Sequence, residues 1–177
     1  MQNGIDLAAY AANYFQVVAA WYGAVGVGRA AGDAWAAAHG ARDAALYDFC
    51  VNPGHFIGYD EWVSSPFTEG SRTPLRSGQA LQMDIIPVAK FEGVTAVYSN
   101  AEDGICLADG ALREEIAADF PAFWARAQAR RAFMRDVIGI ELDESVLPMG
   151  NIPAWLPPYA GDPGTAFTML APPEKSD

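Results

Sequence analysis

Three ionisable residues between residues 53 and 108 have types and positions that suit metal or acid–base chemistry. His55 follows the turn sequence Asn-Pro-Gly, Asp84 interrupts the apolar run LQMDIIPV, and Glu102 comes just before the apolar run GICLA. A charged group in an apolar strand is costly to bury unless it is paired or binds a metal. One imidazole and two carboxylates form a ligand set that suits Mn, Fe, Co or Zn. These residues are therefore the first candidate site.

Each of the three residues also has an ordinary structural explanation. A lone histidine beside a turn is most often structural. Asp84 could pair with Arg72 or Arg76, and Glu102 and Asp103 stand at the start of a predicted strand, where exposed acids are common. Only the combination of the three residues favours a site.

A second group of chemically interesting side chains lies late in the chain. The arginines of the predicted helix over residues 121–137 are Arg126, Arg130, Arg131 and Arg135. They could bind a carboxylate, but pairing with the surface acids Glu114, Glu115 and Asp136 is the commoner arrangement. The sequence contains no Walker phosphate-binding loop and no GxSxG nucleophile elbow. The glycines of GAVGVG have a spacing similar to that of a dinucleotide-binding loop, but they lie between two predicted helices and not after a strand.

The elements that must position these residues follow from hydrophobic periodicity and turn signals. Helices are predicted over residues 6–22, capped by Asp6, over 31–38, ended by Gly40, and over 112–120 and 121–137. Strands are predicted over residues 46–51, 59–64, 80–89, 94–98 and 104–108, with a polar loop over 65–77. This order predicts one α+β domain over residues 1–177, in which 147–177 form a Pro-rich arm.

Composition restricts the partners and the compartment. The chain has 177 residues, 51% of them hydrophobic, and a net charge of −11, which argues against nucleic acid and anionic membranes as partners. No signal peptide and no apolar run of about 18 residues is visible. Cys50 and Cys106 lie in apolar runs and are predicted to be buried thiols, so a cytoplasmic location is expected.

Three motifs together carry a family resemblance. They are HFIG at residues 55–58, LRSGQALQMD at 75–84 and AEDGICL at 101–107. Over residues 7–118 the chain resembles the C-terminal half of the pita-bread metallopeptidases, which include aminopeptidase P, prolidase, methionine aminopeptidase and creatinase. The resemblance implies a partial pita-bread fold with a mainly antiparallel curved sheet and flanking helices. It also implies a peptide or small amide substrate and a divalent metal (Mn, Co, Fe or Zn) bound by His55, Asp84 and Glu102.

The chain departs from the pattern of this family at several points. The family takes two further aspartates from an earlier β-hairpin, and Asp33 and Asp43 do not replace them. Trp62 stands where the family has a second histidine, so Asp60 and Trp62 are the expected substrate contacts. Asp84 occupies the position of a glutamate and is shorter by one methylene. These departures imply a truncated member with weak or absent peptidase activity.

Two other functions remain open at this stage. The chain could be a binding or assembly module that keeps the fold without the chemistry. It could also be a metal-free hydrolase of the creatinase type, with His55 as the acid–base group and Glu102 as an orienting acid. A half-fold would leave a sheet face open, so a homodimer is expected. Alternatively, the tail could cover that face through Trp155 and Tyr159.

Overall fold

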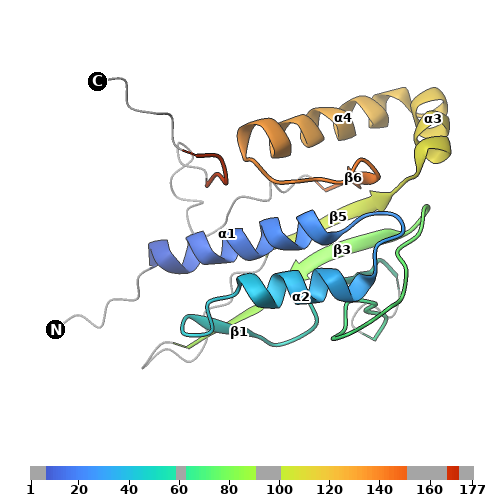
Figure 1. The fold of residues 1–177 in the computed structure, drawn as a ribbon. Coiled ribbons are helices and arrows are strands. Elements are labelled where there is room, and N and C mark those ends of the chain that lie inside the picture. The colour runs from blue at the N-terminus through green and yellow to red at the C-terminus, as the bar shows by residue number, and fades with distance from the viewer. Residues whose placement is uncertain (1–6, 59–62, 91–100, 151–166, 172–177) are drawn as a thin grey trace, which may run out of the picture.

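The computed structural model describes residues 7–58, 63–90, 101–150 and 167–171 (Figure 1). Its helices are α1 (Leu7–Ala24), α2 (Ala31–Ala41), α3 (Gly110–Asp119) and α4 (Pro121–Ala132), and α4 continues into a π-helical turn, η1 (Phe133–Val137). Its strands are β1 (Tyr47–Phe49), β2 (His55–Phe56), β3 (Ala80–Ile85), β4 (Pro87–Ala89), β5 (Ala101–Leu107) and β6 (Val146–Pro148). Helices and antiparallel strands confirm the predicted α+β class.

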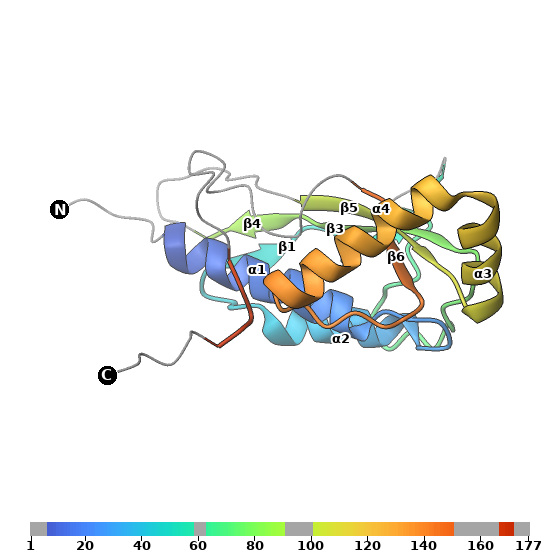
Figure 2. The ribbon, with the colours of Figure 1, turned by 90° about the horizontal axis from the view of Figure 1, so that it is seen from above.

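The strands form a four-stranded antiparallel sheet in the order β2-β3-β5-β6, and β1 and β4 pair separately. In this register Asp84 lies opposite Glu102, and His55 lies opposite Gln82. Because successive strand residues point to opposite faces, these four residues share one face of the sheet. Figure 2 shows α1 and α2 together on one side of the strands, with α4 running obliquely across from the level of α1 to that of β5.

The core lies between these helices and the sheet. On the helix side, the buried strand residues are Leu81, Met83, Ile85, Ile105 and Leu107. Helix α1 packs against them with a dense set of aromatic residues, namely Tyr10, Tyr14, Phe15, Trp21 and Tyr22. Full burial of one large apolar side chain contributes roughly 1.5–3 kcal/mol, so tertiary packing stabilises this helix more than its own propensity does.

Helix α2 packs closely because its buried residues are small, namely Ala31, Gly32, Ala34 and Ala38. Gly32 donates its amide to the Ser71 carbonyl at 3.1 Å, and a Cβ at this position would meet that oxygen at 2.4 Å. The prediction that Gly40 ends the helix is wrong, because α2 continues to Ala41. Asn13 of α1 donates its side-chain amide to the Ala41 carbonyl, which satisfies one of the exposed carbonyls at this end.

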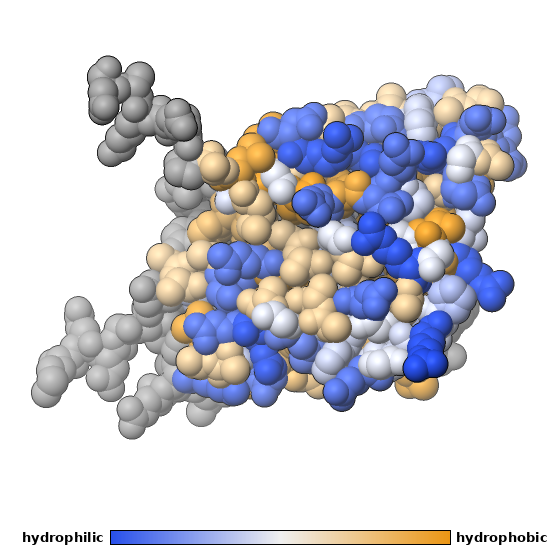
Figure 3. Space-filling model, viewed as in Figure 1, coloured by the Kyte–Doolittle hydropathy of each residue, from blue (hydrophilic) through white to orange (hydrophobic). Residues whose placement is uncertain are grey.

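Small side chains also form part of the outer surface of the two packed helices. In Figure 3 a pale band of weakly hydrophobic residues runs over α1 and α2 between blue polar patches. A hollow of about 770 Å³ follows this band and is lined by Ala20, Gly23 and Ala37, among others.

Several predicted boundaries need correction. The expected strand over residues 80–89 divides after Ile85, and its second part pairs with β1 instead of continuing in the large sheet. The expected strand over 104–108 begins at Ala101. Residues 63–64 form a turn rather than strand, whereas His55–Phe56 is a strand that the turn signal concealed.

Some expectations fall on residues that the structure does not describe. These are the cap at Asp6, residues 59–62 of a predicted strand, the strand over 94–98, and the tail segment with Trp155 and Tyr159. The thiol prediction is wrong for Cys50, which is exposed, while Cys106 is partly buried. Within the described ranges, every helix is too short or too polar to cross a lipid bilayer.

Candidate functional site

His55 reaches the sheet through a close approach of two backbones. Gly54 precedes it with a φ of +115°, a conformation that side chains other than glycine rarely adopt. A Cβ on Gly54 would lie 2.6 Å from the carbonyl oxygen of Gln82, so only glycine lets β2 approach β3 this closely. The resulting strand places the His55 side chain in the interior, where the residue is 1% exposed.

The His55 ring has a defined orientation. Its Nδ1 atom lies 2.9 Å from the carbonyl oxygen of Phe56. Because a carbonyl oxygen only accepts, Nδ1 carries the proton in this contact. Nε2 faces the Asp84 Oδ2 atom at 3.5 Å. Metal-binding histidines commonly hold one ring nitrogen on a carbonyl in this way and present the other to the ion.

Asp84 is a buried carboxylate, as its apolar neighbours indicate, and it is 1% exposed. Its ion-pair partner among the described residues is His55. The alternative pairing is wrong, since neither Arg72 nor Arg76 reaches it in this part of the chain. An imidazole nitrogen and a carboxylate oxygen that face each other without a shared proton repel, so a proton or a cation between them stabilises the pair.

Glu102 lies on the same face but does not complete a three-residue cluster. It is opposite Asp84 on β5, is exposed, and accepts a hydrogen bond from the Gln82 side chain at 2.8 Å. Across the described ranges, no three His, Cys, Asp or Glu side chains converge closely enough to hold a metal ion. The structure therefore brings His55 and Asp84 together and leaves Glu102 beside them, turned toward Gln82. Asp60 and Trp62, the expected substrate contacts, lie outside the described residues.

Sequence reasoning missed a second buried polar cluster on the helix side of the sheet. Asp103, expected as an exposed acid, is 1% exposed. Its Oδ2 atom accepts from the Tyr22 hydroxyl at 2.6 Å and from Arg130 Nη2 at 2.9 Å. Burial raises the pKa of the Asp103 carboxyl, and the Tyr22 hydrogen bond and the Arg130 charge oppose that rise. The alternation of a strand was the available signal, because Glu102 and Asp103 must face opposite sides.

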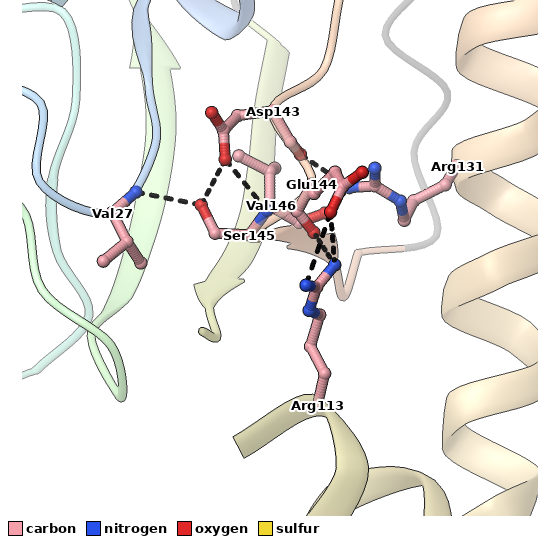
Figure 4. Close-up of polar contacts among 7 residues, drawn as sticks. All are labelled: Val27, Arg113, Arg131, Asp143, Glu144, Ser145 and Val146. Atoms are coloured by element: carbon pink, nitrogen blue, oxygen red, sulfur yellow. Dashed lines mark hydrogen bonds and ion pairs between the residues drawn. The ribbon is translucent and has the colours of Figure 1, made fainter. Parts of the chain in front are cut away.

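The neighbouring arginines also differ from expectation. Arg131 is buried and donates to the backbone carbonyls of Asp143 and Val146 (Figure 4). In the same view Arg113 of α3 pairs with Glu144, and Ser145 hydrogen-bonds Asp143. The predicted partners of the late arginines were surface acids on α3 and η1, and this is wrong for Arg130 and Arg131. Arg130 binds Asp103 of β5 and so holds that strand against the helices. Arg131 does the same for Asp143, which precedes β6, and for Val146 within it.

Comparison of the chain with family models, with curated proteins and with solved structures returned no match.

Proposed function

We propose that this chain is a hydrolase-like protein of the pita-bread type that binds one divalent ion through His55 and Asp84, with Glu102 as the third ligand. The observation that carries the proposal is the His55–Asp84 pair. Both residues are buried, Nδ1 of the imidazole is held by a backbone carbonyl, and Nε2 lies 3.5 Å from a carboxylate oxygen. The order of the three sequence motifs gives it independent support.

The donor atoms fit the metals that the resemblance implies. Imidazole nitrogen with carboxylate oxygen suits Mn, Fe, Co or Zn. Glu102 would have to exchange its hydrogen bond with Gln82 for the ion, which makes metal binding weaker than in a preformed site. When bound, such an ion polarises a substrate carbonyl and makes bound water more acidic. Peptides and small amides are the proposed substrates, and Asp60 and Trp62 the proposed substrate contacts.

The number of available ligands argues for low activity. Family members use five protein ligands, whereas the described residues of this chain bring two side chains into contact and place a third nearby. We therefore expect weak or absent peptidase activity from the isolated chain. We further propose a homodimer whose second copy covers the site-bearing face, on which Glu102 is exposed and Ile57 of the adjoining segment is 46% exposed.

The decisive experiment measures metal content. The chain is equilibrated with Mn²⁺ or Co²⁺, passed through gel filtration and analysed for metal per chain. His55→Ala and Asp84→Asn should lose the ion, whereas His39→Ala, which changes the other histidine of the chain, should retain it. Equal retention in all variants would contradict the assignment. Hydrolysis of X-Pro dipeptides by the metal-loaded protein then tests the activity, and light scattering tests the dimer.

A non-catalytic binding or assembly module is the second candidate. The observation that favours it is the lack of a three-residue metal cluster within the described ranges. Wild-type chain that retains no metal and hydrolyses no dipeptide would support this function. Hydrolysis that persists in EDTA and is lost in His55→Ala would support the metal-free hydrolase instead.

A further inference from the structure

A small pocket lies between α4 and the segment that follows β6, away from the His55–Asp84 pair. Its volume is about 280 Å³. Phe123, Ala127, Pro148 and Met149 supply apolar walls, and the two charged residues that line it in the described part of the chain are Arg126 and Arg130. Asp103 lies directly behind this wall, because a Cβ on the lining residue Gly150 would be 2.0 Å from its Oδ1 atom, and its pairing with Arg130 leaves Arg126 as the charge of the pocket without an acidic partner among the described residues.

The two arginines have different local partners. Arg130 donates from Nη2 to Asp103, and its Nε is buried without an acceptor among the described residues. Arg126 is exposed, and its guanidinium lies 5.9 Å from the centre of the Phe123 ring. No described acid forms an ion pair with Arg126. Residues four apart on a helix share a face, so both guanidinium groups border the same space.

The backbone amides of the opposite wall are already hydrogen-bonded and do not offer a binding site for an anion. The amides of Met149 and Gly150 both donate to the carbonyl of Gly104, at 2.7 and 3.1 Å. The polar recognition that this pocket offers therefore comes from guanidinium groups. The planar fork of arginine matches the two oxygens of a carboxylate, and the apolar walls favour a hydrocarbon group attached to it.

We propose that this pocket binds a small molecule that carries a carboxylate next to an apolar group. Arg126 makes the principal contact with the carboxylate, and the Phe123 and Met149 side chains cover the apolar part. The proposal does not depend on metal binding at His55, because the two sites share no residue.

The test uses two ligands that differ only at the acid. N-acetyl-leucine carries the carboxylate, and N-acetyl-leucinamide replaces it with a neutral amide of the same shape. Binding of each to the full chain is measured by calorimetry and by amide chemical shifts, in EDTA so that a metal cannot hold the carboxylate. The acid should bind at least about tenfold more tightly than the amide and shift the amide signals of Ala127 and Ala129, since hydrogen bonds to charged groups are the strong ones.

Matched variants locate the contact. Arg126→Gln should weaken binding of the acid about tenfold or more, and Arg126→Lys should restore only part of it, because a lysine lacks the planar fork. Arg135→Gln removes an exposed arginine that does not line the pocket and should leave the affinity unchanged. Equal affinities for acid and amide, no binding of the acid, or equal losses in Arg126→Gln and Arg135→Gln would overturn the proposal. Retained binding in His55→Ala separates it from the metal site.

Discussion

Breaking the buried contact between Arg130 and Asp103 by removing one partner should cost far more stability than breaking a surface ion pair of the same protein. We expect Arg130→Met to lower the free energy of unfolding by about 3 kcal/mol, the lower end of the range for breaking a buried pair. The lower end applies because burial already raises the pKa of Asp103, so the carboxyl can take up a proton instead of remaining charged and alone. Tyr22→Phe removes only the 2.6 Å hydrogen bond to the same oxygen and should cost about 1.5–3 kcal/mol.

Urea unfolding at neutral pH, with the slope of the transition checked for each variant, measures these differences. Glu144→Gln is the matched surface control, because the Glu144 side chain is 85% exposed and its pair with Arg113 should contribute less than about 1 kcal/mol. The double variant Asp103→Asn with Arg130→Met leaves no isolated charge and should recover at least about half of the loss. The reasoning would be refuted if Arg130→Met proved as stable as Glu144→Gln. It would also be refuted if the double variant proved no more stable than Arg130→Met.

Three further predictions concern two glycines of α2, the buried hydroxyl of Tyr14 and the carboxylate of Asp143. Gly32→Ala should destabilise the chain by more than about 1 kcal/mol, because its Cβ would lie 2.4 Å from a backbone oxygen. Gly40→Ala in the same helix meets no atom within 4 Å and should stabilise it by about 0.5–1 kcal/mol; thermal melts that rank the two variants in the reverse order would contradict this. Tyr14→Phe leaves a buried carbonyl of β3 and a buried amide of β5 without their hydroxyl partner, and should cost about 2 kcal/mol in urea unfolding. Burial raises the pKa of Asp143, but two hydrogen bonds from Ser145 together with the charge and hydrogen bond of Arg29 outweigh it, so the pKa is lowered. This carboxylate therefore stabilises the fold above about pH 4 and loses its contribution as the pH falls through its folded-state pKa. Stability measured against pH should therefore fall less steeply in Asp143→Asn than in wild type below about pH 4, and parallel curves would exclude the effect.

Much of the fold could be predicted from local pattern alone. The helices α1 and α4 follow from apolar spacing and from Pro121 at a first turn, and β3 and β5 from their apolar runs. Helix ends were less predictable. Gly40 is a residue type that commonly ends helices, but α2 continues to Ala41. The carbonyl of Ala41 accepts a hydrogen bond from the side chain of Asn13 in α1, which lies 28 positions earlier in the chain. Local sequence contains no information about such a donor.

The candidate site was predictable in composition but only partly in geometry. The apolar context of Asp84 correctly indicated burial, and its partner proved to be the histidine of another strand rather than a nearby arginine. The two-residue strand β2 could not be predicted, because its sequence reads as part of a turn and its pairing depends on Gly54 in a conformation only glycine favours. Glu102 was predicted only to stand at the start of a neighbouring strand; its position opposite Asp84 follows from the register, and its hydrogen bond to Gln82 depends on side-chain rotamers that the pattern does not specify.

The adjacent acids Glu102 and Asp103 show how one strand serves two environments. Asp103 is held on the helix side by α1 and α4, and this contact sets the position of β5 against the helices. Glu102 then necessarily faces the opposite side, directly across from Asp84. A slip of one residue would exchange the two acids, which would place Glu102 in the apolar core and Asp103 beside Asp84. The buried cluster therefore determines which carboxylate is presented to the candidate site, although none of its side chains contacts that site.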